Sequence, residues 1–304
     1  AKNLLSLGQK VAIYDPSSER CDLAENSGID IFSERHSLIE KSTALIIASP
    51  NQFHLNDLKD GIGANCHCFV EKPISHTIVG LEAILDQAEE KNRKIFCGLN
   101  LRFNPATLKA KTLIEKKVIG QPQWATLTSS HYLPDWRPQQ NFLEGYTADR
   151  FTGGVIFDII HEFDLANYLL GPGRTILAAA RNTGAINLPS EDCADIILAH
   201  NSGIHSNLHL DYVTRPTQRI TKIGAPQGVI EINFVTRTVS HNNKNGDLEN
   251  YYDFSQTNSN DDYKNEMTAF INCIKPFAAS LADGCLPPLT KLFVYVVAII
   301  AISG

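Results

Sequence analysis

The sequence predicts two domains: an α/β domain at residues 1–102, and an α+β domain with an open, mostly antiparallel sheet at residues 103–304. The length of 304 residues, with 43% hydrophobic and 20% charged residues, suits a globular protein of about two domains. Short apolar strands alternate with helices in the first third of the chain, which is the pattern of an α/β fold. Runs in the second half alternate apolar and polar residues, as half-buried strands do.

Composition and charge exclude several classes of function. The formal net charge of -6 and the pI near 5.9 argue against a nucleic acid or an anionic membrane surface as a partner. There is no run of about 18 apolar residues and no signal peptide, so we expect no membrane partner. Seven cysteines without a framework spacing indicate a reducing cytoplasm. Cys66-His67-Cys68 lacks a second pair at zinc spacing, so we expect no metal site.

The chain begins with a predicted helix at residues 1–7 and a short buried strand at residues 10–14, which ends at Asp15. In a dinucleotide-binding unit, a strand and a glycine-rich turn precede such a helix and bring its N-terminus to the pyrophosphate. Neither is present in these 304 residues. Asp15 stands where an acidic residue would hold the adenosine ribose, although an aspartate at a strand end is more often a turn former.

Two further strands of the first domain end in polar residues. The apolar runs at residues 44–48 and 66–70 have the length of buried parallel strands, and ligands bind at the carboxyl ends of such strands. The residues that follow them are Ser49, Pro50, Asn51, His54, Glu71 and Lys72. A lysine at a strand end, beside its own carboxylate and before Pro73, can serve as a positioned proton donor. The alternative is a surface Glu-Lys pair before a turn.

One predicted helix of the second domain has a polar face. Apolar residues at helical spacing predict a helix over residues 153–170, which ends at Gly171. On such a helix Asp158, His161 and Asp164 are three-residue neighbours and share a face. A histidine between two carboxylates is an acid/base candidate, because a carboxylate can fix its tautomer and raise its basicity. The alternative is a structural histidine with satisfied hydrogen bonds.

The rest of the second domain is predicted to be mostly strands. Residues 133–150 have no strong period, and we interpret them as a loop over a substrate or as a solvated excursion. The predicted strands lie at residues 124–132, 175–182, 193–200, 203–213, 219–223, 228–233 and 236–241. A helix at residues 289–303 is apolar on all sides, so we expect it to be buried between the domains or in a subunit contact.

Six short motifs lie in order along the chain. They are Ser49-Pro50-Asn51-x-x-His54, Glu71-Lys72-Pro73, Gly98-x-Asn100-x-Arg102-Phe103-Asn104-Pro105, Gly153-Gly154, Asp158-x-x-His161-x-x-Asp164 and Asp262-Tyr263-x-x-Glu266-Met267. This ordered set resembles the Gfo/Idh/MocA oxidoreductase family, which includes glucose–fructose oxidoreductase and inositol dehydrogenase. The resemblance implies a Rossmann-like first domain and a second domain whose open sheet forms a homo-oligomer, either a dimer or a tetramer. It also implies NAD(P)-dependent redox chemistry on a sugar, a cyclitol or a related small molecule.

The resemblance assigns roles to individual residues. Lys72 would hydrogen-bond the reacting oxygen, while His161 takes or returns the proton and Asp158 orients it. The cofactor residues would be Asp15 at the ribose, Ser49, Pro50 and Asn51 at the pyrophosphate and ribose, and His54, Glu71 and Asn100 nearer the nicotinamide. The substrate residues would be Arg102, Tyr132, Trp136 and Asp164. Because the carboxylate of Asp15 would repel a 2′-phosphate, NAD is favoured, while Ser17, Ser18 and Arg20 leave NADP as an alternative.

The sequence departs from the family pattern in two places. The glycine-rich turn is missing, and Asp158 precedes His161 by three residues where the family more often has four. This shorter spacing, with the Tyr-Leu-Pro-Asp-Trp segment at residues 132–136, resembles oxidoreductases encoded with bacterial surface-sugar or nonulosonic-acid pathways. Two alternatives to an enzyme stay open: a non-catalytic member that senses a nucleotide or sugar, and a truncated, inactive form. The presence of Lys72 with the other proton-transfer residues argues against a sensor.

Overall fold

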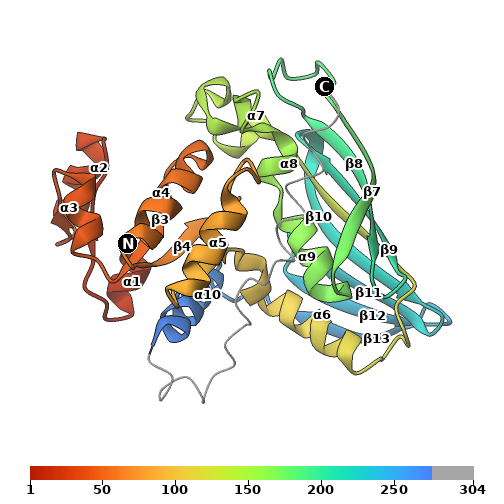
Figure 1. The fold of residues 1–304 in the computed structure, drawn as a ribbon. Helices are drawn as coiled ribbons and strands as arrows, with labels where there is room; N and C mark the ends of the chain where they lie inside the picture. The colour runs from red at the N-terminus through yellow and green to blue at the C-terminus, as the bar shows by residue number, and fades with distance from the viewer. Residues whose placement is uncertain (276–304) are drawn as a thin grey trace. The chain divides into compact units, whose positions relative to one another are not determined.

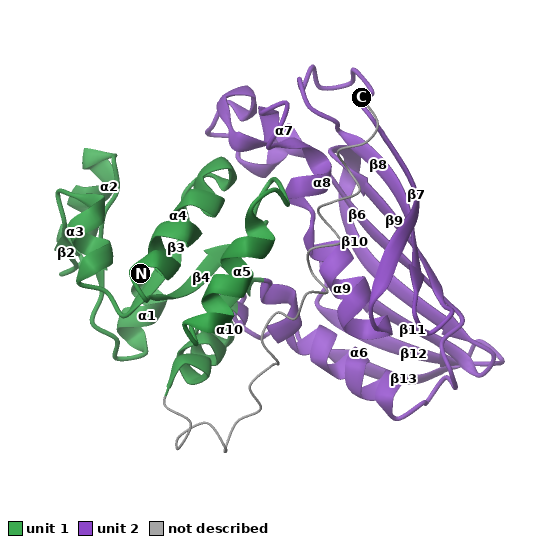
Figure 2. Ribbon diagram, viewed as in Figure 1, with its two compact units in different colours: residues 1–98, 263–290 green, residues 99–262, 291–304 purple. Residues whose placement is uncertain are grey.

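The structure is a computed structural model that describes residues 1–275. The chain divides into two compact units (Figure 2). The first contains residues 1–98 and the segment that starts at residue 263, and the second contains residues 99–262. The predicted division between residues 102 and 103 stays a prediction, and the predicted helix at residues 289–303 lies outside the described residues.

The first unit consists of short parallel strands and helices, which confirms the predicted α/β class (Figure 1). Strands β1 (Ala12–Ile13) and β2 (Asp30–Ile31) pair in parallel. Strand β4 (His67–Glu71) lies between β3 (Ala44–Ile47) and β5 (Ile95–Gly98), and both pairs are parallel. The helices of this part of the chain are α1 (Lys2–Ser6), α2 (Ser18–Glu25), α3 (Arg35–Glu40), α4 (Asn51–Gly63) and α5 (Leu81–Glu90).

An aromatic cluster forms part of the core of the first unit. Phe69 of β4 stacks on Phe96 of β5 with 5.6 Å between ring centroids, and the ring of Phe270 meets both from helix α10 (Asn260–Ile274). Phe69 and Phe270 are fully buried. Burial of such rings contributes most of what holds a helix to a sheet. This cluster therefore fixes the central strand, whose end bears Glu71 and Lys72.

The second unit contains a large sheet. In the described residues eight strands run in the order β13-β12-β11-β10-β6-β9-β8-β7, and all neighbours are antiparallel except β6 and β9. This confirms the predicted open, mostly antiparallel sheet. The strands are β6 (Trp124–Tyr132), β7 (Gly173–Arg181), β8 (Cys193–His200), β9 (His205–Asp211), β10 (Val213–Ala225), β11 (Gly228–Asn233), β12 (Thr238–Asn243) and β13 (Leu248–Asp253).

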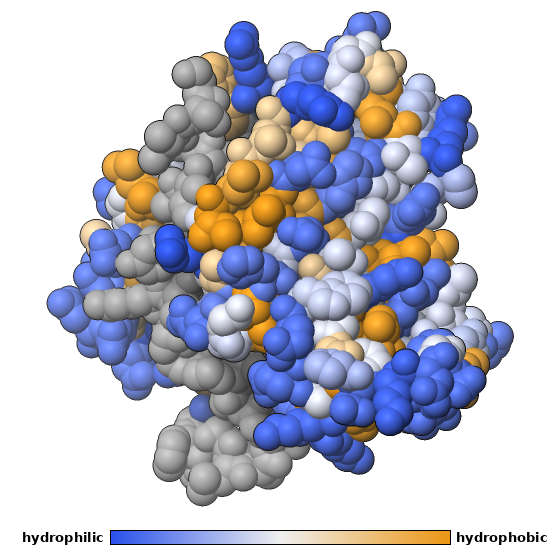
Figure 3. All heavy atoms as spheres, turned by 90° about the vertical axis from the view of Figure 1, so that its right-hand side faces the viewer, coloured by the Kyte–Doolittle hydropathy of each residue, from blue (hydrophilic) through white to orange (hydrophobic). Residues whose placement is uncertain are grey.

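Among the described residues, helices cover one face of this sheet, and no helix covers the other face, which we call the open face. Leu127, Leu208 and Leu210 of the sheet belong to one buried cluster with Leu165 of helix α9 (His161–Leu170) and Leu113 of helix α6 (Pro105–Glu115). Residues that alternate with these leucines point to the opposite side. Figure 3 faces that side and shows groups of apolar residues between hydrophilic ones.

The prediction of one helix over residues 153–170 is wrong. The segment forms helix α8 (Gly154–Asp158) and, after a break, helix α9. Ile159 leaves the helical region with φ -97° and ψ 29°. Ile159 and Ile160 are β-branched and buried, and such side chains lose rotamer freedom in a helix. The break lies between Asp158 and His161, so these two side chains are placed by different helices.

The irregular segment at residues 133–150 folds into short turns of helix. They are α7 (Leu133–Trp136), η2 (Phe142–Glu144) and η3 (Tyr146–Ala148), and another 3₁₀ turn, η1 (Asn100–Phe103), starts the second unit. Among the described residues, none of the helices has the length and apolar character needed to cross a membrane.

Candidate active site

The predicted cofactor residues of the first unit, apart from Asp15, lie at or after the carboxyl ends of β3 and β4. Ser49 lies two residues after β3, Glu71 ends β4, and Gly98 ends β5. A Cβ atom at Gly98 would lie 3.0 Å from a carboxylate oxygen of Glu71, so the glycine leaves room for that carboxylate. Pro50 and the buried Asn51 begin helix α4, which places a helix N-terminus directly after β3.

His54 connects two of these strand ends. Its ring is buried, with Nδ1 2.7 Å from the carbonyl oxygen of Pro73 and Nε2 2.7 Å from that of Ser49. A carbonyl oxygen only accepts hydrogen bonds, so a neutral ring donates one of these bonds and a doubly protonated ring donates both. His54 thereby holds the turn that follows Lys72. Its predicted contact with the nicotinamide stays a prediction.

Glu71 and Lys72 form a charged pair at the end of β4. Burial raises the pKa of Glu71, while the backbone N–H of Lys72 and the positive charges of Lys72 and His54 oppose this rise. The Lys72–Pro73 peptide bond is cis. The bond between His54 and the Pro73 carbonyl oxygen holds the chain directly after Lys72.

Asp15 and Ser49 have local partners in the first unit. The Oδ1 atom of Asp15 accepts a hydrogen bond from the Ser17 backbone at 2.9 Å, and its Oδ2 lies 3.3 Å from the Arg20 guanidinium. The turn-forming role considered for Asp15 is thus present, and its ribose contact stays a prediction. The Ser49 hydroxyl donates to Asp57 at 2.5 Å, which fixes the loop after β3.

In the second unit, two tyrosine hydroxyls hold the carboxylate of Asp158. The hydroxyl of Tyr212 donates to Oδ2 at 2.9 Å, and the hydroxyl of Tyr146 donates to Oδ1. Burial, and then the negative charge of Asp158, raises the pKa of both tyrosines, so they keep their protons at neutral pH and remain donors. His161 lies at the start of α9, after the break that follows Asp158.

A row of rings leads from Asp158 to Trp136. The His131 ring lies 5.1 Å from that of Tyr212 and 5.9 Å from that of Trp136. Trp136 is about half exposed, so this row reaches solvent. Tyr132 alternates with His131 on β6 and packs instead under the Arg215 guanidinium, 3.7 Å away. The structure therefore connects Trp136 to Asp158 through the rings of His131 and Tyr212, whereas the Tyr132 ring contacts Arg215.

Two buried ion pairs occupy the first turn of α9. The guanidinium of Arg102 binds both carboxylate oxygens of Asp164, with N–O distances of 2.9 and 2.5 Å. The guanidinium of Arg219 binds one carboxylate oxygen of Glu162 at 2.7 Å. Burial raises the pKa of each carboxyl, and the facing arginine opposes the rise. The predicted substrate residues Arg102 and Asp164 thus bind each other, and a contact of either with substrate stays a prediction. Asn100 lies in η1, beside Arg102.

Sequence reasoning did not select Tyr146 or Tyr212. Tyr146 lies in the aperiodic segment at residues 133–150, and Tyr212 follows the end of a strand, so neither forms a motif with Asp158. The only signal was indirect: an irregular segment directly precedes the glycine pair that starts α8.

The role of His54 can be tested with the substitution His54→Gln. A glutamine side chain cannot reach both carbonyl oxygens, so the Lys72 turn should loosen. We expect kcat of the implied redox reaction to fall about 10-fold or more, since small misplacements of catalytic groups have such effects, while the Kd for NADH changes little. Fluorescence titration with NADH and steady-state kinetics measure the two quantities. His36→Gln, at an exposed surface position, is the control. An equal loss in NADH affinity and kcat would indicate a direct cofactor contact instead.

The role of Tyr146 can be tested with Tyr146→Phe, which removes one donor from Asp158 and keeps the ring. A hydrogen bond to a charged group contributes about 1.5–3 kcal/mol, so we expect kcat/KM to fall about 10- to 100-fold. Tyr263→Phe is the matched control, because Tyr263 is an exposed residue of α10. If steady-state rates of the two variants were alike, the Tyr146 hydroxyl would have no part in the reaction.

Comparison with known proteins identifies relatives of both units. Residues 2–99 match the model of an oxidoreductase family with an NAD-binding Rossmann fold, named GFO_IDH_MocA, and residues 107–231 match the GFO/IDH/MocA C-terminal domain. The myo-inositol 2-dehydrogenase of Thermotoga maritima is 26% identical over 306 residues, covering 93% of this chain and 87% of that protein. The inositol 2-dehydrogenase of Rhizobium meliloti is 28% identical over 79% of this chain and 73% of its own length.

Solved structures share the fold. Levoglucosan dehydrogenase in complex with NADH superposes with a TM-score of 0.76 at 18% identity, covering 86% of this chain and 79% of that one. A UDP-N-acetylglucosamine 3-dehydrogenase from Acidithiobacillus ferrooxidans gives a TM-score of 0.76 at 20% identity, covering 98% and 89%. At these identities the likeness is one of fold. The two domain matches, in the predicted order, show that the chain belongs to the Gfo/Idh/MocA family of NAD-binding oxidoreductases.

Proposed function

We propose that this protein is an NAD-dependent dehydrogenase or reductase that acts on a hydroxyl or carbonyl group of a sugar, a cyclitol or a sugar derivative. The observation that carries the proposal is the position of Lys72. This lysine directly follows Glu71, the last residue of the central strand β4 in the parallel sheet of the Rossmann domain. The named inositol dehydrogenases among the relatives support this class of substrate. The narrower resemblance to surface-sugar oxidoreductases favours a modified bacterial sugar.

The residues of the first unit fit a dinucleotide. Asp15, after β1, offers carboxylate oxygens to the ribose hydroxyls, and its negative charge disfavours the 2′-phosphate of NADP. The N-terminus of the 13-residue helix α4, at Asn51, favours the negative pyrophosphate. When bound, NAD supplies the hydride chemistry. Glu71 and Asn100 are the residues that we assign to the nicotinamide side.

The protein residues handle the proton and the charge on oxygen. Lys72 donates a hydrogen bond to the reacting oxygen and stabilises the negative charge that develops there in oxidation. His161 takes the hydroxyl proton in oxidation and returns it in reduction, and Asp158 orients the imidazole. Because Asp158 receives neutral hydroxyl donors from Tyr146 and Tyr212, it keeps a negative charge that stabilises a protonated His161.

The assignment of Lys72 is tested by Lys72→Ala in the whole chain. We expect kcat to fall about 10²- to 10⁴-fold, the range for a general acid or base, with the Kd for NADH near that of the unchanged protein. Substrate screening on sugars and cyclitols with NAD and NADP supplies the assay.

The assignment of Asp15 is tested by Asp15→Asn. In titrations with NADH and NADPH, this substitution should weaken NADH binding and leave NADPH binding less affected.

The matched control for Lys72→Ala is Lys59→Ala, since Lys59 is an exposed lysine on α4. Intact turnover with lost NADH affinity in Lys72→Ala would contradict the proposed role. NADH binding without turnover of any substrate, already in the unchanged protein, would favour a nucleotide-sensing member of the family.

We infer further that copies of the chain associate through the open face of the large sheet. Leu177 of β7, Trp124 of β6 and Tyr251 of β13 are apolar side chains that are 42–57% exposed. The strand registers place all three on the face away from the helices (Figure 3). Apolar residues spread over a whole sheet face are typical of an interface.

This association predicts a dimer or a tetramer in solution. Light scattering should give a mass of about two or four times 33.6 kDa, and Leu177→Arg should lower it because a charge would be buried in the contact. Val235→Arg changes a residue that is equally exposed and lies between β11 and β12, so it should leave the mass unchanged. A monomeric mass for the unchanged protein would contradict this inference.

A further inference from the structure

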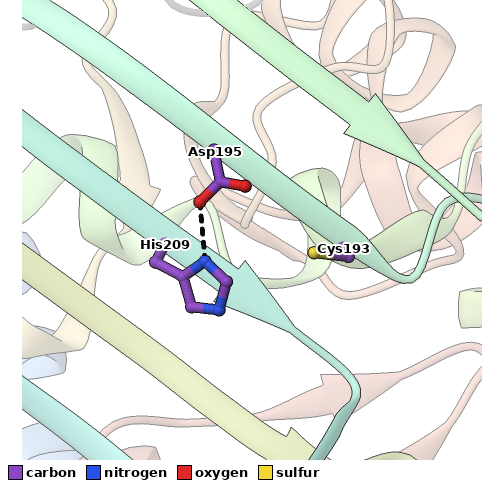
Figure 4. A group of neighbouring side chains, drawn as sticks. All are labelled: Cys193, Asp195 and His209. Atoms are coloured by element: carbon purple, nitrogen blue, oxygen red, sulfur yellow. Dashed lines mark hydrogen bonds and ion pairs between the residues drawn. The ribbon is translucent and has the colours of Figure 1, made fainter. Parts of the chain in front are cut away.

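The open face of the large sheet carries a group of cysteine, aspartate and histidine that the proposed redox reaction does not use (Figure 4). Cys193 and Asp195 lie two residues apart on β8, and His209 lies opposite Asp195 on β9. One potential ligand atom from each side chain lies within 4.8 Å of the other two. Thiolate, carboxylate and imidazole are the groups that bind zinc in proteins.

A buried carboxylate orients the histidine of this group. The Nε2 atom of His209 lies 3.1 Å from Oδ2 of Asp211, which is 1% exposed. The other oxygen of Asp211 accepts the backbone N–H groups of Val213 and Thr214, so the carboxylate is fixed. Histidines that bind metal ions usually donate their second ring N–H to such a carboxylate, which leaves the first nitrogen for the ion.

The first nitrogen of His209 faces another acceptor. Nδ1 lies 2.7 Å from Oδ1 of Asp195. When Nε2 carries the proton given to Asp211, Nδ1 and Oδ1 both present lone pairs, and only a proton or a cation between them makes this approach favourable. The sulfur of Cys193 lies within 4.8 Å of both atoms. A proton shared by Nδ1 and Oδ1 would not bind this sulfur, whereas a metal ion could. A metal ion could replace the proton between His209 and Asp195 after side-chain rotations that lengthen their 2.7 Å contact, and Cys193 would then supply a third ligand.

The surroundings favour a divalent ion. The carboxylates of Asp195, Asp211 and Asp192 and the guanidinium of Arg181 all act on Cys193. A dication would offset the negative charge of the three carboxylates. In a single chain the side chains of Asp195 and His209 are 58% and 43% exposed, so a fourth ligand, from water or from the neighbouring subunit in the contact that we infer, can complete a tetrahedral site.

We propose that Cys193, Asp195 and His209 bind one zinc ion on the open face of the sheet, with Asp211 orienting His209. The site is separate from the residues assigned to hydride and proton transfer, and its test does not depend on that activity. Neighbouring strands β8 and β9 would be bridged by the ion.

The test is a titration of the reduced, untagged full chain with Co²⁺, followed by displacement with Zn²⁺. A cobalt–thiolate absorption band in the unchanged protein would report the sulfur ligand, and calorimetry should give one zinc per chain. Cys193→Ser should abolish the band. Asp195→Asn and His209→Gln should each weaken binding about 10-fold or more, and Asp211→Asn about 10- to 100-fold, the usual effect of removing the group that orients a ligand.

His205→Gln is the matched control. His205 lies on the same strand and the same face as His209, and Asn207 lies between the two on that face. Circular dichroism would establish that each variant folds. If the unchanged protein gave no cobalt–thiolate band, or if His209→Gln bound Co²⁺ as tightly as the unchanged protein, the proposal would be wrong and a proton would join His209 to Asp195.

Discussion

Burial of the central strand β4 is the constraint on which the first unit depends. Cys68, Phe69 and Val70 are all fully buried, and the Phe69 ring is held by Phe96 and Phe270. A strand packed in this way cannot shift without opening cavities that destabilise by about 2–5 kcal/mol each. Its carboxyl end is consequently a fixed point. Glu71 and Lys72 are polar because this is where the chain leaves the core, and they are well positioned for the same reason.

The second unit fixes its acidic groups by two different means. The Asp164 and Glu162 carboxylates are each paired with an arginine, so each pair has little net charge and holds α9 to the neighbouring elements. Asp158 is held by the Tyr146 and Tyr212 hydroxyls, which are neutral donors. A hydroxyl fixes the position of a carboxylate without cancelling its charge. Of these three acidic residues, Asp158 is therefore the one whose charge can act on a proton.

Local pattern predicted much of this structure. Strand 193–200 was predicted with the bounds that it has in the structure. The apolar runs before Ser49 and Glu71 were predicted as buried parallel strands; in the described sheet the second is central, whereas the first lies at the edge. Strand β13 was not predicted, because Leu248–Asp253 has little apolar alternation. This segment becomes a strand through its antiparallel pairing with β12. The break after Asp158 was also missed, since helical spacing of apolar residues continues across it. Strand β13 forms by pairing with the preceding strand, and the break coincides with the buried, β-branched Ile159 and Ile160, so the spacing of apolar residues reveals neither feature.

The candidate site shows the same division. Lys72, Asp158 and His161 could be selected because they belong to short motifs, and the family match supports their selection. Their partners could not be selected: Tyr212 is 54 residues from Asp158, and His54 acts through carbonyl oxygens that any residue would supply. A motif records which groups do the chemistry, whereas the groups that hold them are chosen by the fold. Because the pKa values of Tyr146 and Tyr212 are raised above those of an unfolded chain, the stability that their protonated hydroxyls contribute is complete below about pH 10 and declines as the pH rises from there through their folded-state pKa values. The position of Asp158 is therefore independent of the proton exchange that we propose for His161.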